Sequence, residues 1–182
     1  MPVSYETFER VALEDPEGMW ELHCGALRQK PEMTAEHNHI GRTLAFDLQL
    51  QLNRRDYEVS WNAGYVRRQN MLAYIADVIV IPVPLLTPQR AVTDRLESYT
   101  DPLPLVVEVW SRSTGDYDIS DKVPEYMRRG DAEIWHIHPY EQTLTAWRRQ
   151  PDGSYSESVY TTGVIELAAL PSVRINLEEL FA

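Results

Sequence analysis

Apolar residues recur along the chain with two spacings, which together predict helices and strands. The clearest helix is predicted over residues 34–52, with Thr34 as its N-cap. Its apolar side chains follow one face at every fourth position: Ile40, Leu44, Leu48 and Leu52. Further helices are predicted over residues 4–14, 120–129 and 177–181, and a short helix or mobile excursion over residues 87–96. In the helix 120–129, Pro124 is expected in the first turn, where its missing donor costs least.

Strands are indicated by short apolar runs and by alternation of apolar with polar residues. They are predicted over residues 19–23, 26–30, 57–61, 65–68, 71–81, 103–111, 133–137, 143–148 and 154–161. Helices alternate with strands, and several strands follow one another as hairpins. This order predicts an α/β fold with a mixed sheet and helices packed on it. Because no repeat or linker interrupts the pattern, residues 1–182 are expected to form a single domain.

Two acids interrupt strands that are otherwise apolar. Asp77 lies within the run 74–81, and Glu108 lies within the run 105–110. Such continuous apolar runs are typical of strands covered on both faces. Asp and Glu are almost never fully buried unless they are paired, so each needs a cation, a hydrogen-bonding partner or a cleft that admits water. One Mg²⁺ would serve both acids, while a structural salt bridge or a strand-end position would explain each acid separately.

Composition narrows the class of protein. Of the 182 residues, 43% are hydrophobic and 25% are charged, as in a globular domain. The single cysteine, Cys24, excludes an intramolecular disulfide, so a reducing, cytoplasmic setting is expected. The first residues do not resemble a signal peptide, and no apolar run approaches the roughly 20 residues that span a membrane.

The net charge of −11, from 17 basic and 28 acidic side chains, counts against a protein that coats nucleic acid. It does not exclude a nuclease, because a bound divalent cation and a local basic patch can offset acidity within a site.

A series of motifs runs through the chain in a distinctive order: Glu108-Val109-Trp110-Ser111-Arg112-Ser113-Thr114, Tyr117-Asp118, Lys122, Tyr126, Gly130, Glu133, Trp135 and Pro139. Glu21 with Gly25, His37, and the closing segments Leu170-Pro171 and Leu180-Phe181 extend it toward both ends. In these features the chain resembles the Uma-two family, which is grouped with restriction endonucleases in the PD-(D/E)-x-K nuclease superfamily.

The resemblance implies a restriction-endonuclease-like fold, in which a mixed sheet flanked by helices carries acids on two adjacent strands. It implies that Asp77, Glu108 and the backbone carbonyl of Val109 bind Mg²⁺, or Mn²⁺ in its place. Trp110 occupies the usual lysine position, and the family moves the lysine to the next helix, here Lys122. The implied activity is hydrolysis of phosphodiester bonds, with DNA as substrate and a homodimer to cut both strands.

Other candidates follow from single residues. Glu21 could serve as an extra ligand or base, or be an exposed strand acid. His37 could bind phosphate or relay a proton, although a satisfied core histidine is the commoner outcome. His136 and His138 share a strand face, which is a weak metal signal. Substrate contacts are expected at Arg67-Arg68, Arg112 and Arg128-Arg129, where the alternative is a solvated basic face.

Two hypotheses of different class therefore stand. The first is a Mg²⁺-dependent DNA endonuclease that uses Asp77, Glu108 and Lys122. The second is a non-catalytic module that binds nucleic acid or protein and keeps the nuclease fold, which the acidic net charge favours. A structural oligomer with a vestigial site is a third reading.

Overall fold

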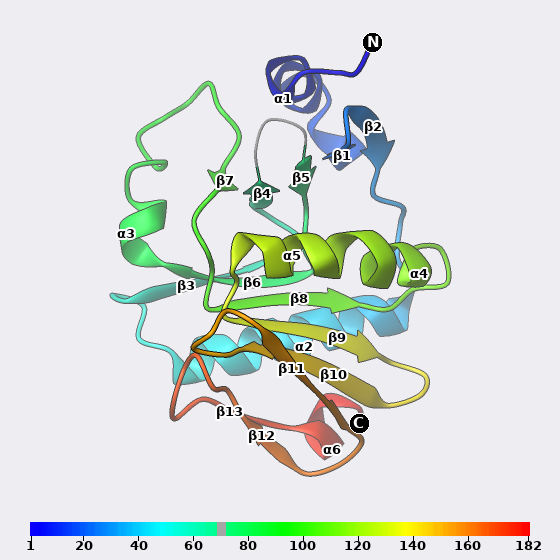
Figure 1. Cartoon of the computed structure of the whole chain (residues 1–182), viewed down its shortest axis with the longest axis vertical. Coiled ribbons are helices and arrows are strands. Elements are labelled where there is room, and N and C mark those ends of the chain that lie inside the picture. Colours follow the sequence, from blue (N-terminus) through cyan, green and yellow to red (C-terminus); the bar gives the residue numbers. More distant parts are fainter. Residues whose placement is uncertain (69–71) are drawn as a thin grey trace.

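A six-stranded mixed sheet forms the centre of the computed structural model, which describes residues 1–68 and 72–182 (Figure 1). Across this sheet the strands follow the order β11 (Tyr155–Tyr160), β10 (Thr143–Arg149), β9 (Glu133–His138), β8 (Leu105–Val109), β6 (Val78–Pro82) and β3 (Tyr57–Trp61). Strands β8 and β9 run parallel, and the other neighbours pair antiparallel. The predicted mixed α/β fold is thereby confirmed.

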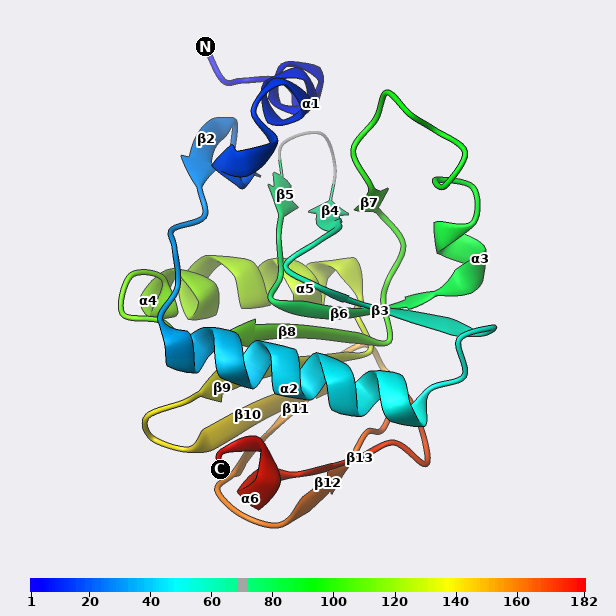
Figure 2. The same ribbon diagram turned by 180° about the vertical axis from the view of Figure 1, so that it is seen from behind.

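Two helices cover the two faces of this sheet. Helix α2 (Ala35–Gln51) lies on one face and α5 (Val123–Arg129) on the other, as Figures 1 and 2 show from opposite sides. Successive side chains of a strand point to opposite faces. In β8, Val107 packs with the residues of α2, and Val106 packs with those of α5. Glu108 therefore shares the α5 face with Val106.

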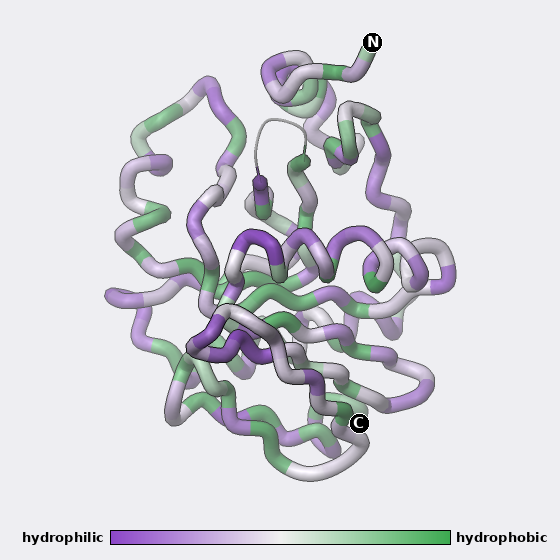
Figure 3. The backbone as a smooth tube through the Cα atoms, in the orientation of Figure 1, coloured by the Kyte–Doolittle hydropathy of each residue, from purple (hydrophilic) through white to green (hydrophobic). Residues whose placement is uncertain are grey.

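A second sheet stands at one edge of the first. Its order is β2 (Ala26–Gln29), β1 (Trp20–His23), β5 (Leu72–Tyr74), β4 (Tyr65–Arg68) and β7 (Ser98–Tyr99). Helix α1 (Tyr5–Glu14) closes its outer face, where Phe8 packs against Leu22 and Ala73. These strands are short and rich in polar residues, so most of the apolar core lies around the larger sheet, whose central strands are green in Figure 3.

Short elements complete the described chain: η1 (Pro16–Gly18), α3 (Val83–Leu86), α4 (Gly115–Tyr117), η2 (Asp118–Lys122), β12 (Val164–Glu166), β13 (Arg174–Asn176) and α6 (Leu177–Leu180). Strands β12 and β13 form a separate hairpin sheet beside α6. No strand was predicted at β7, β12 or β13, because two or three residues carry no visible period. Within the residues described, no helix combines the length and apolar character needed to cross a membrane.

The predicted helix 34–52 is confirmed in its cap and in its buried face. Thr34 accepts a hydrogen bond from the backbone N–H of His37, and Ile40, Leu44 and Leu48 are fully buried. The amphipathic spacing thus seats α2 on the sheet and sets His37 in its first turn.

The prediction of one continuous strand over residues 71–81 was wrong. Met71 lies outside the described residues, and the remainder divides into β5 and β6, which belong to different sheets. The chain crosses between the sheets at Ile75, whose N–H donates to the Glu21 carboxylate at 2.8 Å. The crossing is apolar in sequence, so the hydrophobic pattern conceals it. It also leaves Asp77 at the junction of the two sheets.

The helix predicted over residues 120–129 begins earlier than expected. Helical structure runs from Gly115 to Arg129 in three consecutive segments, and Pro124 lies in the first turn of the last one, α5, as expected. The segment η2 is a π-helix in which the Val123 N–H reaches the Asp118 carbonyl. The wider turn comes immediately before the proline, which has no donor of its own. Residues 87–96 form turns and bends, while the short helix α3 precedes them.

Candidate active site

Four carboxylates from four separate segments meet beside one cavity of about 300 Å³. They belong to Glu21 on β1, Asp77 before β6, Glu108 on β8 and Asp118 in η2, and each residue is at most 3% exposed. Two lysines, Lys30 and Lys122, line the same cavity. The fold therefore brings together three of the predicted acids, the predicted lysine, and two residues that the sequence did not single out.

Asp77 is held by three donors. Lys30 Nζ lies 2.7 Å from Oδ1, while His37 Nε2 and the Val109 N–H lie 3.1 Å and 2.6 Å from Oδ2. A carboxylate can only accept, so Nε2 of His37 must carry a hydrogen. Nδ1 of His37 is buried and meets no hydrogen-bond partner among the described residues. His37 thus positions Asp77 from the N-terminal turn of α2.

The pKa of Asp77 is held below its usual range. Burial alone would raise the pKa of this carboxyl, but the Lys30 ammonium and the His37 hydrogen bond outweigh burial and lower it. Asp77 is therefore an ionised acceptor at neutral pH, and it needs no metal to remain charged.

Glu108 differs from Asp77 in its surroundings. Tyr126 OH donates to Oε1 at 2.5 Å, and Lys122 Nζ lies 3.4 Å from the same oxygen. Burial raises the pKa of Glu108 well above its ordinary value, and the nearby Asp118 and Asp77 add to the rise while Lys122 opposes it. A carboxylate in this position gains strongly from any further positive charge.

Lys122 is the cation shared by the acids on the α5 side. Its Nζ lies 2.9 Å from Glu21, 3.4 Å from Glu108 and 3.7 Å from Asp118. Burial would lower the pKa of this ammonium, but the carboxylates around it, Glu108 first, raise the pKa well above its ordinary value. The lysine predicted from the displaced motif is therefore a buried, charged donor that faces the cavity.

Glu21 joins the two sheets and is not the exposed strand acid considered as its alternative. Its Oε1 accepts from the Ile75 N–H and lies within ion-pair distance of Lys122. The second residue of β1 thus fixes both the chain crossing and the lysine.

The sequence pattern does not predict Lys30 or Asp118 as site residues, for different reasons. Lys30 follows a short hairpin strand, where a lysine gives no signal of burial. Asp118 was part of the family motif, but without a role of its own. Burial raises the pKa of Asp118 to about 6, with Lys122 opposing the rise. Its Oδ1 is buried and has no hydrogen-bond partner among the described residues, so the position facing it can take a donor or a cation.

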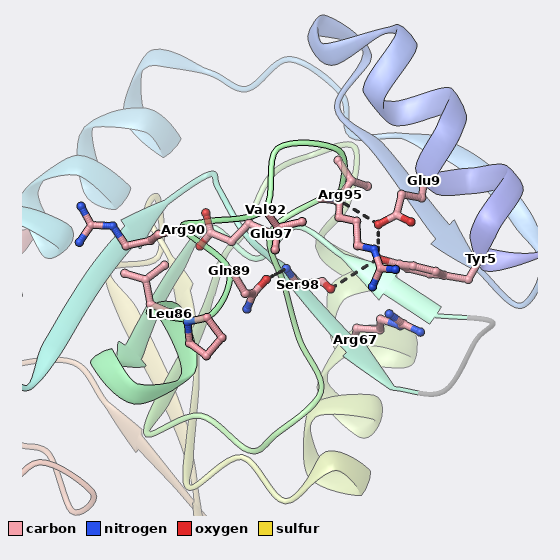
Figure 4. A pocket seen from close by; sticks show the side chains of 12 residues that line it. Tyr5, Glu9, Arg67, Leu86, Gln89, Arg90, Val92, Arg95, Glu97 and Ser98 are labelled. Atoms are coloured by element: carbon pink, nitrogen blue, oxygen red, sulfur yellow. Dashed lines mark hydrogen bonds between the residues drawn. The ribbon is translucent and has the colours of Figure 1, made fainter.

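The predicted arginine contacts are scattered. Arg67 lies over the Tyr5 ring, in a different pocket of about 460 Å³ beneath α1 (Figure 4). Arg128 pairs with Glu125 on the outer side of α5. Arg112 is exposed three residues after the end of β8 and precedes Ser113, which lines the cavity. Of the three, Arg112 alone is next to the candidate site.

His136 and His138 have different neighbours. His138 stacks on Trp110, with ring centroids 4.2 Å apart, and its Nδ1 accepts from the Glu141 N–H. His136 stands opposite Glu108 in the β8–β9 register. Burial lowers the pKa of His136 to about 4, so its ring is neutral. Neither arrangement supports the weak metal signal of their spacing.

The donor set of the cavity suits a hard divalent cation in chemistry and in charge. Mg²⁺ prefers carboxylate oxygens together with water. With Glu21, Asp77, Glu108 and Asp118 ionised, Lys30 and Lys122 leave a formal charge of −2 on the cluster. Within the described part of the chain, however, no three acid, histidine or cysteine side chains are already arranged as metal ligands. Both ammonium groups stand against the carboxylates that a metal would use.

The fold and the buried acid–lysine cavity define a protein of the nuclease-like α/β class. The chain belongs to the Uma2 family, whose model, described as "Putative restriction endonuclease", matches residues 5–178. A solved structure from Anabaena variabilis ATCC 29413, described as a putative nuclease belonging to DUF820, shares the fold with a TM-score of 0.76 at 16% identity. That match covers 99% of this chain and 98% of the other. None of the curated proteins matches the chain.

Proposed function

We propose that this chain is a divalent-metal-dependent endonuclease that hydrolyses phosphodiester bonds in DNA, with the whole site inside one domain of residues 1–182. The observation that carries the proposal is the meeting of Glu21, Asp77, Glu108 and Lys122 at one buried cavity. Membership of a family whose model is described as "Putative restriction endonuclease" supports the same reading. Phosphodiester hydrolysis needs a charge-stabilising site that reaches solvent, and this cavity has both properties.

Asp77 and Glu108 are the proposed metal ligands, with the backbone carbonyl of Val109 as the third. A bound Mg²⁺ or Mn²⁺ would activate water and neutralise the charge that develops on phosphorus. Asp77 is suited to this role because His37 and the Val109 N–H fix one of its oxygens. Glu108 is suited to it because its burial favours added positive charge.

Lys122 is the proposed catalytic cation. Its ammonium is held by Glu21 and Glu108, so its direction is set before substrate arrives. A fixed donor of this kind stabilises an oxyanion without reorganising during the reaction. Glu21 keeps Lys122 in place and is a candidate base for the attacking water. His37 acts through Asp77, to which it donates.

Binding of the substrate is assigned to the rim of the cavity. Arg28 is exposed and lines the cavity, where it lies over the Tyr117 ring at 4.7 Å, and Arg112 is exposed next in sequence to the lining residue Ser113. With a net charge of −11, the chain has little general attraction for DNA. Contact is therefore expected over a few phosphates, and a homodimer would bring two such sites to the two strands.

A cleavage assay tests the proposal. Supercoiled plasmid, linear duplex and single-stranded DNA are incubated with the protein in Mg²⁺, in Mn²⁺ and in EDTA. Metal-dependent cleavage is expected, and Asp77→Ala should slow it about 1,000-fold, since losing about 4 kcal/mol of charge stabilisation costs a factor of ten per 1.36 kcal/mol. Asp116→Asn is the matched control: it removes an exposed acid two residues before Asp118, outside the cavity lining.

Equal cleavage by wild type and Asp77→Ala would show a contaminating nuclease. Absence of cleavage on every substrate would favour the non-catalytic binding module, which the acidic net charge supports. Calorimetry with Mn²⁺ then separates the two readings, because the nuclease site must bind the ion and Glu108→Gln must weaken that binding.

A further inference from the structure

Lysine is rare in this chain and is confined to the candidate site. Of the 17 basic residues only Lys30 and Lys122 are lysines, so the other 15 are arginines. Both lysine side chains are buried, at 5% and 2% exposure, and both line the same cavity. Lys122 faces Glu21, Glu108 and Asp118, whereas Lys30 serves Asp77. The mechanism assigns a task to Lys122 and none to Lys30.

The Lys30 ammonium is fully hydrogen-bonded. Its Nζ donates to Asp77 Oδ1 at 2.7 Å, to Asn62 Oδ1 at 2.8 Å and to the Ile75 carbonyl at 3.0 Å. An ammonium has three hydrogens, and three acceptors surround it. The lysine therefore occupies a defined binding position for a cation, next to the oxygen of Asp77 that the other donors leave free.

The three donors on Asp77 differ in their freedom to move. The Val109 N–H belongs to the backbone of a central strand, and His37 belongs to the first turn of α2. Lys30 reaches Asp77 by a flexible four-carbon stem from the segment that joins β2 to α2, seen in Figure 2 beside α4. Neighbouring residues of that segment, Gln29, Pro31 and Met33, also line the cavity. Lys30 is thus the donor with the longest and most flexible side chain, and it can leave Asp77 without unfolding an element.

We propose that Lys30 is a built-in counter-ion that a divalent cation must displace from Asp77. The inference rests on the proposed metal-dependent function. With all four carboxylates ionised, the cluster carries a formal charge of −2 while Lys30 is in place and −3 when Lys30 is displaced, which attracts a divalent cation more strongly. In the metal-free protein the Lys30 ammonium offsets the repulsion between the carboxylates. It also lowers the apparent affinity for metal, because it competes for Asp77 Oδ1.

The scarcity of lysine permits a direct test on the whole chain. Purified protein is treated briefly with an amine-acylating reagent, in EDTA and across a Mg²⁺ titration, and modification is measured by peptide mass spectrometry. Lys30 is expected to be protected in EDTA and to react at least tenfold faster as Mg²⁺ saturates the site. Lys122 should stay protected throughout, and the exposed Met1 amino group is the internal standard.

Calorimetry with Mn²⁺ provides the second measurement. Lys30→Met should lower the Kd for Mn²⁺ at least tenfold, because the ion no longer competes with an ammonium. Arg28→Met is the matched control: Arg28 lies on β2 at the same cavity, is exposed, and makes its recorded contact with Tyr117 and not with Asp77. A similar gain in both variants would mean that any lost positive charge suffices, and it would overturn the specific role of Lys30.

The outcomes separate the two proposals. If metal binds and DNA is cut while Lys30 stays protected, or Lys30→Met binds no tighter, the counter-ion proposal fails and the nuclease proposal stands. If metal exposes Lys30 but no DNA is cut, the counter-ion proposal stands and the nuclease proposal fails. If neither wild type nor Lys30→Met binds Mg²⁺ or Mn²⁺, both fail.

Discussion

Two clusters of buried charge lie at opposite ends of α5, and they differ in how completely their charges are matched. In one, Arg129 faces Asp131 at 2.9 Å, and its remaining donors reach the backbone carbonyls of Arg67, Tyr99 and Asp101. Asp131 in turn accepts from the Leu103 N–H. In the other cluster, four carboxylates share two lysines beside a cavity, and Asp118 Oδ1 lacks a hydrogen-bond partner among the described residues.

The difference shows that buried charge alone does not indicate a functional site. Arg129 and Asp131 form a one-to-one pair whose hydrogen bonds tie β4, β7 and α5 together, which is a structural role. With its four carboxylates ionised, the cavity cluster has an excess of negative charge beside a cavity, so it is the candidate for binding a further cation. The excess charge and the free space are what distinguish a binding site from a structural ion pair.

The largest change in the free energy of unfolding is expected from breaking the ion pair between Arg129 and Asp131. Arg129→Met should lower the free energy of unfolding by about 3–5 kcal/mol, since it leaves Asp131 buried without its cation. Urea unfolding at pH 7.5 measures the change. Arg128→Met is the neighbouring control, because Arg128 is largely exposed and its pairing with Glu125 contributes at most about 1 kcal/mol. If Arg129→Met lost less than about 1 kcal/mol, the pair of Arg129 and Asp131 would not be a structural ion pair, and the comparison of the two clusters would fail.

The buried His136, which makes no ion pair with the described residues, should make the stability of the fold depend on pH. Burial lowers the pKa of His136 to about 4 from an ordinary value of 6.5. Between these values the unfolded chain binds the proton and the folded chain does not, so stability is present above pH 6.5 and is lost as pH falls toward 4. At 1.36 kcal/mol per unit the loss is about 3 kcal/mol.

Urea unfolding from pH 7.5 to pH 4 measures this loss. His136→Gln should lack that part of the acid destabilisation, whereas His138→Gln, more exposed and stacked on Trp110, should retain it. Equal pH profiles in wild type and His136→Gln would show that the histidine is protonated in the folded state.

Metal should stabilise the cavity cluster and leave the structural pair unaffected. At a Mg²⁺ concentration 100 times its Kd, the free energy of unfolding should rise by about 2.7 kcal/mol, and EDTA should reverse the gain. Thermal unfolding measures it. Arg129→Met should gain as much as wild type from its lower baseline, while Asp77→Asn should gain almost nothing. A gain that persists in Asp77→Asn would place the ion elsewhere.

The sequence predicts a helix or strand wherever the apolar residues of that element recur with the spacing of a helix or a strand. The spacing of Ile40, Leu44 and Leu48 predicts α2, and the apolar runs around Asp77 and Glu108 predict two central strands. The break at Ile75 stayed hidden because the residues of a crossing between sheets are as apolar as those of a strand. The change of sheet depends on the distant Glu21 carboxylate, which accepts the Ile75 N–H.

The same limit applies to the site. Asp77 and Glu108 could be predicted because a lone acid in an apolar strand is costly wherever the strand lies. Lys122 was found only through the family resemblance, since a lysine early in a helix is usually exposed. Lys30 could not be found at all: its burial arises because the segment after β2 passes the end of β6, which is a long-range property of the fold.

The smallest expected change in the free energy of unfolding distinguishes Glu108 from Asp77, two acids of the same cavity. The pKa of Glu108 is raised, chiefly by burial, so its ionised form costs stability above the ordinary pKa of a glutamate. Glu108→Gln removes that cost and can still accept from Tyr126, but it loses the attraction of Lys122. Its free energy of unfolding at pH 7.5 should therefore stay within about 1 kcal/mol of wild type.

Asp77→Asn should lose more, because the pKa of Asp77 is lowered and its ionised form is stabilising. If urea unfolding found Glu108→Gln the less stable of the two, Glu108 would be a satisfied structural acid like Asp131, and the contrast between the clusters would no longer hold.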